Sequence, residues 1–288
     1  MKTIKVLSRI TTALLCTALT AHAGASPAPA ANAVENRGNS ALASIPGHWV
    51  PDVSDTWHWQ LKGTIDTSYD VKIYDIDLFD VDATTIAALK RAGRRVVCYF
   101  SAGSSEDWRP DFRQFRASDM GKRLNDWKGG RWLDIRSDNV RKVMKQRLDR
   151  AVAKGCDGVE PDNVDGYAND TGFALTAKDQ LDFNAFIANE AHWRDLAVGL
   201  KNDDGQVAAL EPWFDFAVNE KCSAQSVCDG YAIFTSKNKP VLNAQYAQQY
   251  RTSSVQRMPC DASTKVSSRT LDLAAALNNS YRPSCYDR

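Results

Sequence analysis

The chain has 288 residues, of which 36 are Lys or Arg and 35 are Asp or Glu, so its formal net charge at pH 7 is +1. Because the two signs nearly cancel, there is no excess of positive charge to bind nucleic acid or an anionic membrane surface. Neither is therefore expected as a partner.

The first residues have the order of a secretory signal peptide. Three basic residues precede an apolar stretch over residues 10–19, and Ala21-His22-Ala23 places small residues at the two positions that a signal peptidase reads. The apolar stretch is shorter than the about 20 residues with which a helix spans a membrane. We predict a signal peptide over residues 1–23 and a secreted protein, extracellular or periplasmic, with no membrane association after cleavage.

The composition changes after the signal peptide. Residues 24–47 are rich in Ala, Asn, Ser, Pro and Gly, have little to bury, and are typical of a flexible leader. Residues 48–288 then have the length of one α/β barrel. We expect them to form a single domain, and the protein to be a monomer.

Six cysteines remain beyond the signal peptide, and an even number in an oxidising compartment favours disulfides. Cys222–Cys228 and Cys260–Cys285 are the natural local pairs. Cys98 and Cys156 either form a third bridge or remain buried as small apolar side chains. A metal site is the alternative use of cysteine, but the chain has no Cys-x-x-Cys motif and few histidines. We expect no metal and no cofactor.

Short apolar runs alternate with amphipathic segments along the rest of the chain. The predicted strands cover residues 57–61, 70–77, 95–102, 131–135, 157–163, 196–202, 215–220 and 240–246. Apolar residues recur at spacings of three and four in the predicted helices, 84–92, 139–153, 177–193 and 271–277. Eight strands alternating with helices predict a (β/α)8 barrel of the TIM type. An open doubly wound sheet is the alternative, although no GxGxxG motif or P-loop supports it.

Two segments depart from the regular barrel pattern. The first two strands are separated by only about eight residues, which is too few for a full crossover helix. The loop from Gly103 to Gly130 is long and carries Trp108 and Trp127. Long loops after barrel strands usually build the rim of the functional site.

Polar residues, mostly carboxylates, end nearly every predicted strand. Active-site groups of a barrel project from the carboxyl ends of its strands, and burying so many unpaired acids elsewhere would be costly. The period of two places Glu160 and Asp162 on one face of their strand, and Glu220 ends a strand two further along. We therefore expect Asp162 and Glu220 to face each other across the barrel mouth. Glycoside hydrolysis requires such a pair of carboxylates.

Each of these side chains also has a structural explanation. For Asp134, the preferred explanation is that it caps or orients the helix that follows it. Glu220 could instead pair with Lys201 or Lys221. Aromatic residues near the same strand ends are candidate platforms for sugar rings. Trp59 is one of them, and the alternative role for its side chain is to pack in the core.

The segment from Trp49 to Tyr246 resembles glycoside hydrolase family 114, a family of endo-α-1,4-polygalactosaminidases with a (β/α)8 barrel. The motifs that carry the resemblance occur in the expected order. They are Trp57-His58-Trp59-Gln60-Leu61, Tyr74-Asp75-Ile76-Asp77, Cys98-Tyr99-Phe100-Ser101-Ala102-Gly103, Asp157-Gly158-Val159-Glu160-Pro161-Asp162-Asn163-Val164-Asp165, Leu200-Lys201-Asn202 and Asn219-Glu220-Lys221-Cys222.

The resemblance implies roles for individual residues. Asp162 matches the family's proposed nucleophile and Glu220 its general acid/base. Gln245 stands where family members often have a glutamate, which leaves one acidic contact in doubt. The complete set of predicted substrate-binding residues is Trp59, Tyr74, Asp75, Tyr99, Asp134, Glu160, Asn163, Lys201, Gln245 and Tyr246.

The predicted function is a secreted endo-acting hydrolase of an α-1,4-linked galactosamine and N-acetylgalactosamine polysaccharide, whose free amines suit an acidic cleft. We expect retention of configuration, and we expect neighbouring negative charge to raise the pKa of Glu220. One alternative is an exo-acting, α-galactosidase-like enzyme on another α-linked glycan. Another is a catalytically silent carbohydrate-binding barrel. A metal-dependent deacetylase would need His and Asp ligands that the chain does not offer.

Overall fold

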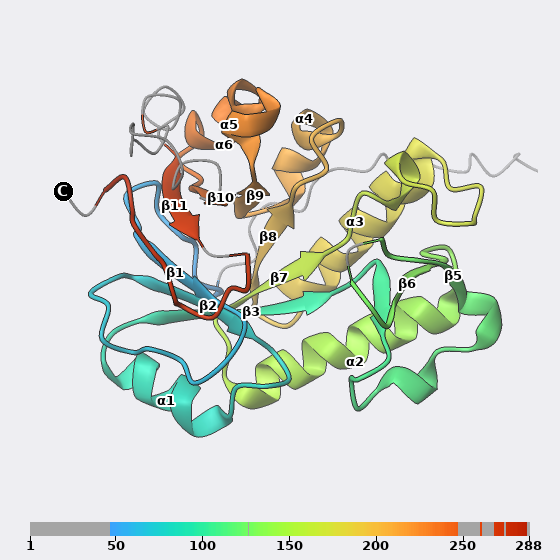
Figure 1. Ribbon diagram of the computed structural model, residues 1–288, viewed down its shortest axis with the longest axis horizontal. Coiled ribbons are helices and arrows are strands. Elements are labelled where there is room, and N and C mark those ends of the chain that lie inside the picture. Colours follow the sequence, from blue (N-terminus) through green and yellow to red (C-terminus); the bar gives the residue numbers. More distant parts are fainter. Residues whose placement is uncertain (1–46, 126, 247–259, 261–267, 274, 287–288) are drawn as a thin grey trace, which may run out of the picture. The chain divides into compact units, whose positions relative to one another are not determined.

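The computed structural model describes residues 47–286, except 126, 247–259, 261–267 and 274 (Figure 1). The chain divides into two units, Met1–Ser40 and Ala41–Arg288, and the described residues all belong to the second. The predicted signal peptide over 1–23 lies outside the described residues, as does the predicted leader over 24–47 apart from Gly47.

Eight parallel strands form the central sheet, in the order β1-β2-β3-β7-β8-β9-β10-β11. The two ends of this sheet approach each other, because the indole Nε1 of Trp57 in β1 donates a 2.7 Å hydrogen bond to the carbonyl of Arg269 in β11. The prediction of a (β/α)8 barrel is confirmed. The strands are β1 (Trp57–Gln60), β2 (Ile73–Asp77), β3 (Arg95–Ser101), β7 (Gly158–Asp162), β8 (Ala197–Lys201), β9 (Phe216–Glu220), β10 (Val241–Tyr246) and β11 (Arg269–Leu273).

One predicted strand has the wrong place and one predicted helix is wrong. The strand predicted at 131–135 forms, but it belongs to a separate small sheet and not to the barrel, and the predicted helix at 271–277 contains the end of β11. Leu271 and Leu273 point into the barrel, and Thr270 and Asp272 alternate with them. The short sequence Leu271-Asp272-Leu273 fits a period of two as well as a helical spacing, and a run of that length does not distinguish the two.

Alternating side chains of the strands fill the barrel interior. These inward-facing residues are large and apolar in the lower part of the barrel: Trp57, Trp59, Ile73, Val97, Phe216, Val218, Leu242 and Leu271. In several of these strands, the residue two positions further along also faces inward, and it is polar. The strand period therefore brings Glu160, Lys201 and their neighbours to the carboxyl end of the barrel.

Helices cover the outside of the first strands, and the later crossovers are short. The helices are α1 (Ala83–Arg91), α2 (Asp138–Lys154), α3 (Ala177–His192), α4 (Val207–Leu210), α5 (Cys222–Gln225) and α6 (Ala232–Thr235). Helix α2 begins after Ser137, whose side chain accepts from the Val140 N–H, and ends at Gly155 with a φ of 85°. Its apolar stripe packs on β3 and β7 in the outer core. Within the described part of the chain, no helix has the length and hydropathy to cross a membrane.

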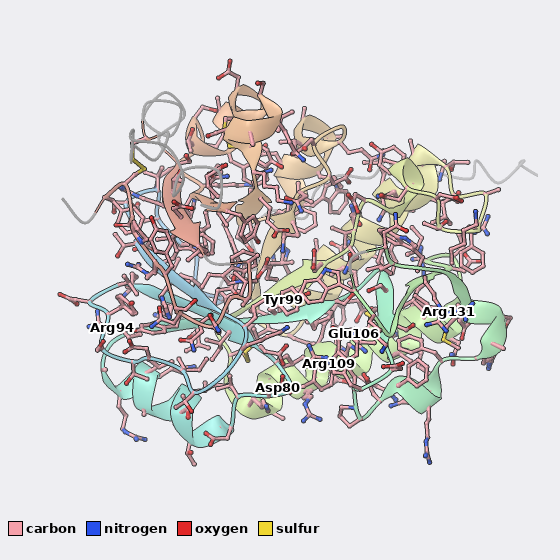
Figure 2. All side chains as sticks on the ribbon, in the orientation of Figure 1. Asp80, Arg94, Tyr99, Glu106, Arg109 and Arg131 are labelled. Carbon is pink, nitrogen blue, oxygen red and sulfur yellow. A yellow bond between two sulfur atoms is a disulfide. The ribbon has the colours of Figure 1, made fainter. Side chains whose placement is uncertain are left out.

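The long segment after β3 folds into a small antiparallel sheet of β4 (Ser104–Glu106), β6 (Gly130–Leu133) and β5 (Met120–Arg123). Buried Arg109 fixes this insertion to the barrel, as Figure 2 shows beside Glu106. Its guanidinium donates to Asp77 Oδ1 at 2.9 Å and to Glu106 Oε2 at 2.8 Å. Asp77, which ends β2, is thereby used as a structural anchor.

Three disulfides are present, Cys98–Cys156, Cys222–Cys228 and Cys260–Cys285. The two local pairs expected from the sequence are confirmed, and the remaining two cysteines form the third bridge. Cys98 in β3 lies in the outer core, so its bridge to Cys156 ties the end of α2 to the barrel away from the interior.

Candidate active site

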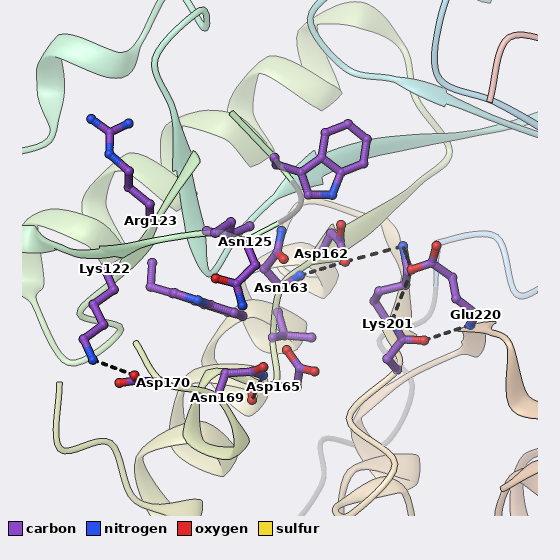
Figure 3. A pocket seen from close by; sticks show the side chains of 15 residues that line it. Lys122, Arg123, Asn125, Asp162, Asn163, Asp165, Asn169, Asp170, Lys201 and Glu220 are labelled. Atoms are coloured by element: carbon purple, nitrogen blue, oxygen red, sulfur yellow. Dashed lines mark hydrogen bonds and ion pairs between the residues drawn. The ribbon is translucent and has the colours of Figure 1, made fainter. Parts of the chain in front are cut away.

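A cavity of about 350 Å³ opens at the carboxyl ends of β7, β8 and β9 (Figure 3). Four of the predicted site residues line it: Asp162, Asn163, Lys201 and Glu220. The insertion sheet and its loops supply another part of the wall, through Lys122, Arg123, Leu124, Asn125, Trp127 and Trp132. The sequence indicated that this segment would form a rim, but it gave no residue-level signal for the contacts.

Asp162 is held at the end of β7 by donors on both sides. The Tyr99 hydroxyl donates to Oδ2 at 2.8 Å, and the Asn163 backbone N–H donates to Oδ1 at 2.8 Å. Asn163 has a φ of 59°, and its side chain donates to Ser101 Oγ at 2.9 Å. Gly103 packs so closely that a Cβ there would lie 1.8 Å from the Asn163 carbonyl oxygen, so this position requires glycine.

Glu220 ends β9, and residues at the ends of the two neighbouring strands form hydrogen bonds with it. Its backbone N–H donates to Asn202 Oδ1 at 2.8 Å, and Asn202 Nδ2 donates to its Oε2 at 3.3 Å. The Tyr246 hydroxyl donates to Oε1. Burial by itself raises the pKa of Glu220, but Lys201, Tyr246 and Asn202 together hold it below its ordinary value. The expectation of a raised pKa is therefore wrong.

Lys201 lies between the two carboxylates that the sequence singled out, as Figure 3 shows. Its Nζ is 3.4 Å from Asp162 Oδ1 and 3.5 Å from Glu220 Oε2, and the side chain is 2% exposed. Its shortest contact, 2.7 Å, is to Glu160 Oε1 below the cavity. Burial lowers the pKa of Lys201, but the surrounding carboxylates overcome this effect and raise it well above its usual value.

The shared contact with Lys201 limits the separation of Asp162 and Glu220. Because both oxygens lie within ion-pair distance of the same nitrogen, they are no more than about 7 Å apart. Retaining glycosidases have carboxyl groups about 5–5.5 Å apart, and inverting ones about 6.5–9.5 Å. The limit applies to this one pair of oxygens and is compatible with the retaining spacing.

A second layer of polar residues lies beneath Lys201. Glu160 is 0% exposed and accepts a 3.1 Å hydrogen bond from Trp59 Nε1. Asp75 is also 0% exposed, and burial together with Glu160 raises its pKa well above the usual range. Trp59, Asp75 and Glu160 were predicted to contact substrate, but the structure places all three below the cavity wall.

The side chains of two other residues predicted to contact substrate, Tyr74 and Gln245, point away from the barrel interior. Tyr74 alternates with inward-facing Ile73, so it points outward, and its hydroxyl donates to the Tyr69 carbonyl at 2.8 Å. Gln245 alternates with inward-facing Ala244 and donates to Asn243 Oδ1 at 2.8 Å.

Asp134 lies beyond the end of β6 and pairs with Arg136, at 2.8 Å between Oδ1 and Nε. It is absent from the cavity wall. Tyr99 and Tyr246 reach the site through the two carboxylates that their hydroxyls contact.

A second cavity of about 280 Å³ shares Asp165, Asn202 and Glu220 with the first. Asp203 and Asp204 also line it, and neither was predicted as a site residue. Burial, with Asp165 and Asp204 nearby, raises the pKa of Asp203 to about 7. The polar run from Asn202 to Asp204 after a strand end was the available signal. We name this cavity, lined by Asp165, Asp203 and Asp204, the acidic compartment.

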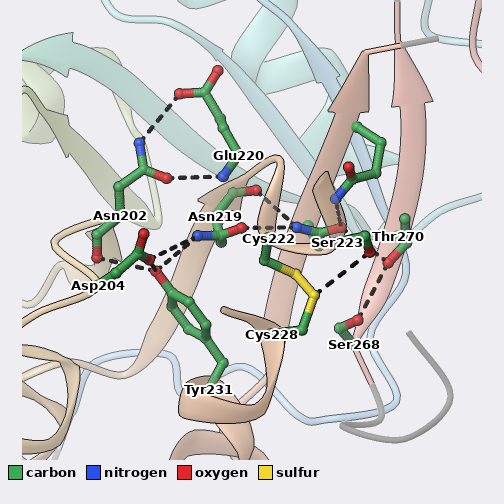
Figure 4. Close-up of a disulfide and its surroundings, with 12 residues drawn as sticks. Asn202, Asp204, Asn219, Glu220, Cys222, Ser223, Cys228, Tyr231, Ser268 and Thr270 are labelled. Carbon is green, nitrogen blue, oxygen red and sulfur yellow. Dashed lines mark hydrogen bonds between the residues drawn. A yellow bond between two sulfur atoms is a disulfide. The ribbon is translucent and has the colours of Figure 1, made fainter. Parts of the chain in front are cut away.

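Hydrogen bonds and a disulfide support the chain around Glu220 (Figure 4). The Tyr231 hydroxyl donates to Asp204 Oδ1 at 2.6 Å, and Asn219 Nδ2 donates to that hydroxyl at 2.8 Å. The Cys222–Cys228 disulfide begins two residues after Glu220. The segment that follows β9 is therefore a short loop closed by a disulfide.

One group in the described ranges has metal-ligand chemistry: His48, His192 and Asp215, whose ligand atoms lie within 4.8 Å of one another. It lies at the opposite end of the barrel, since Asp215 precedes β9. Asp215 accepts from both imidazoles and from the Val198 N–H at 2.9 Å. These hydrogen bonds account for the cluster as a structural one.

Comparison with known proteins gives a consistent result. The model of glycoside hydrolase family GH114 matches residues 38–287. The crystal structure of Ega3 from Aspergillus fumigatus in complex with galactosamine is 43% identical, with a TM-score of 0.77, covering 84% of this chain and 99% of that one. The glycoside hydrolase domain of PelA from Pseudomonas aeruginosa is 10% identical, with a TM-score of 0.59, covering 78% and 96%, which is a likeness of fold alone. No curated protein sequence matches the chain.

Proposed function

The chain belongs to glycoside hydrolase family GH114, and we propose that it cleaves a galactosamine-containing polysaccharide within the chain, with retention, through Asp162 and Glu220. It is a glycoside hydrolase; the substrate, the stereochemistry and the roles of the two carboxylates are the proposal. The observation that carries it is the position of Asp162 and Glu220 on one cavity wall, both within ion-pair distance of Lys201.

The first step is a displacement at the anomeric carbon. A carboxylate oxygen of Asp162 forms a bond to this carbon while the bond to the leaving glycosidic oxygen breaks, and Glu220 gives that oxygen its proton. Tyr99 and the Asn163 N–H orient the Asp162 carboxylate for attack. In the second step Glu220 removes a proton from water, the water oxygen bonds to the anomeric carbon, and Asp162 is released.

The lowered pKa of Glu220 suits the second step, in which it must act as a base. The first step requires the protonated form. A sugar that fills the cavity removes water from Glu220, and burial is the largest influence on this group and acts to raise its pKa. We therefore expect substrate binding to shift Glu220 towards its acid form.

The acidic compartment supports a substrate that carries protonated amines. In the described part of the structure, Asp165, Asp203 and Asp204 form no ion pair with a Lys, Arg or His side chain. The amine of a galactosamine unit would supply the missing charge. The relative from A. fumigatus was crystallised with galactosamine. Two adjoining cavities on either side of Glu220 also suit a chain that extends past the cleaved bond.

The disulfides fit a protein that folds in an oxidising compartment. Together with the predicted signal peptide over residues 1–23 they support secretion. Monomeric state stays a prediction from the sequence.

The test is product analysis after incubation with partly deacetylated α-1,4-galactosaminogalactan, alongside Asp162→Asn and Glu220→Gln. Soluble oligomers from wild type alone would support endo cleavage and both roles, and the anomeric configuration of the first product reports retention. Release of single sugars would instead indicate exo action. Binding without cleavage by folded wild type would refute the hydrolytic proposal for this glycan.

A further inference from the structure

We propose that Asp75 and Glu160 are positioning residues that share one proton beneath Lys201, with Asp75 as a neutral carboxylic acid that donates to Glu160. The pair holds the Lys201 ammonium between Asp162 and Glu220. The role of Lys201 rests on the proposed function, because it depends on the catalytic roles of Asp162 and Glu220. The protonation of Asp75 and Glu160 does not depend on that function.

The surroundings of Asp75 are incompatible with a charged side chain. It is 0% exposed, and in the described structure neither of its oxygens accepts a hydrogen bond from an N–H or O–H donor. No Lys, Arg or His in the described ranges pairs with it. An ionised carboxylate shielded from bulk solvent and without hydrogen-bond donors from the protein loses several kcal/mol, whereas the protonated form is tolerated. Asp75 therefore keeps its proton.

Glu160 is the acceptor for that proton. It lies against Asp75 and is itself 0% exposed, with Trp59 donating to Oε2 at 3.1 Å and Lys201 to Oε1 at 2.7 Å. With these donors, Glu160 is the partner better able to carry the negative charge. Burial raises the pKa of both groups, that of Glu160 to about 7, so the pair retains a single proton, on Asp75, above about pH 7.

The pair sets the position of Lys201 through charge. The charged and titratable groups that face the pair and Lys201 are Tyr99 of β3, Asp162 of β7 and Glu220 of β9. One negative charge on Glu160 balances the pull of Asp162 and Glu220 on the ammonium, which lies 2.7 Å from Glu160 and 3.4–3.5 Å from the other two. A second negative charge, on Asp75, would attract the Lys201 ammonium towards the pair and away from Asp162 and Glu220. A neutral Glu160 would allow the ammonium to move towards Asp162 and Glu220.

The matched variants are Asp75→Asn, which mimics the neutral acid and keeps an N–H donor, and Glu160→Gln, which removes the charge. We expect Asp75→Asn to keep kcat/KM within about threefold of wild type and Glu160→Gln to lose more than about tenfold, mainly in kcat. Loss of activity in Asp75→Asn as large as in Asp162→Asn would overturn the inference, since Asp75 would then be needed as an anion.

Thermal unfolding tests the proton without any substrate. The folded pKa of Asp75 lies above its unfolded value of 3.8, so folding takes up a proton and rising pH destabilises wild type above that value. Asp75→Asn lacks this penalty. Its Tm relative to wild type should therefore increase from about pH 4 to about pH 8. A difference that does not change with pH contradicts the shared proton, even if the protein proves inactive on polygalactosamine.

An infrared measurement covers the case in which Asp75→Asn does not fold. A protonated carboxyl has a C=O stretch separate from those of carboxylates, and we expect it in the wild-type protein at about pH 8, where ordinary carboxyls and most of Glu160 are ionised. Asp203 contributes to this band because its pKa is about 7. The band should persist in Asp203→Asn. Its absence there would refute a neutral Asp75.

Discussion

Asn202, which directly follows β8, and Glu220, which ends the adjacent strand β9, are joined by two hydrogen bonds, from the Glu220 N–H to Asn202 Oδ1 at 2.8 Å and from Asn202 Nδ2 to Glu220 Oε2 at 3.3 Å. Asn202 has a φ of 47°, a conformation that Asn and Asp tolerate better than most residues. It therefore orients the side chain and also lowers its pKa by donating to the charged form. Replacement by a residue of the same shape can separate these two effects.

We expect Asn202→Asp to raise the pKa of Glu220, because a donor is replaced by a second negative charge while the backbone contact remains. Since the first step requires protonated Glu220, the alkaline limb of kcat/KM should move to higher pH. The measurement is the pH profile of kcat/KM for both proteins. An unchanged alkaline limb would show that Glu220 does not control it.

Loss of the Lys201 charge should destabilise the fold. Lys201→Gln leaves the carboxylates of Glu160, Asp162 and Glu220 without their common cation, so we expect a loss of about 3–5 kcal/mol in the free energy of unfolding. The folded pKa of Lys201 is raised above 10.5, so its contribution is present at all lower pH values and disappears only in strong alkali.

Urea denaturation at neutral pH measures this loss. Lys221→Gln is the matched control, since Lys221 is exposed and its ammonium lies 5.4 Å from the Tyr246 ring centroid. An equal loss in the two variants would show that the buried position of Lys201 has no special importance.

Binding of an amino sugar in the acidic compartment should release protons. Asp203 has a pKa of about 7, so it is partly protonated near neutral pH, and a cation beside it favours the ionised form. Calorimetry of galactosamine oligomers in buffers of different ionisation enthalpy would count the protons.

We expect release near pH 7 from wild type, little from Asp203→Asn, and little with fully N-acetylated oligomers, which have no charge. Equal proton release by both kinds of oligomer would place the amine outside this compartment.

Two of the disulfides, Cys222–Cys228 and Cys98–Cys156, should differ in their effects on stability and on catalysis. Cys222–Cys228 closes a short segment next to Glu220, with a sequence separation of 6, whereas Cys98–Cys156 has a separation of 58 and lies in the outer core. By loop length alone, replacing each pair with serines should cost about 2 kcal/mol for the first and about 4 kcal/mol for the second.

We expect kcat to fall only in the Cys222/Cys228 variant, since only that bridge fixes the chain leaving Glu220. Unfolding curves and kcat on the same preparations compare the two effects. A fall in kcat for the Cys98/Cys156 variant alone would reverse this assignment.

The barrel could be predicted because its signals are local. A period of two in strands such as Gly158–Asp162 and helical spacing in Asp138–Lys154 are properties of neighbouring residues. The predictions were wrong where a short segment satisfied two periods, as at Leu271-Asp272-Leu273. The role of residues 131–135 depended on pairing with β4 and β5, which the strand sequence does not show.

The sequence by itself determined the chemistry available: carboxylates at strand ends, six cysteines beyond the predicted signal peptide, and the alternation that puts Glu160 and Asp162 on one face. The tertiary structure alone decided which acids line the cavity, which lie beneath it, and which sign the pKa shift of Glu220 takes. That shift is the balance between burial and the charges and donors of β8 and β10, namely Lys201, Asn202 and Tyr246. These groups are distant in sequence, and their effect depends on distances of a few ångströms that only the closed barrel sets.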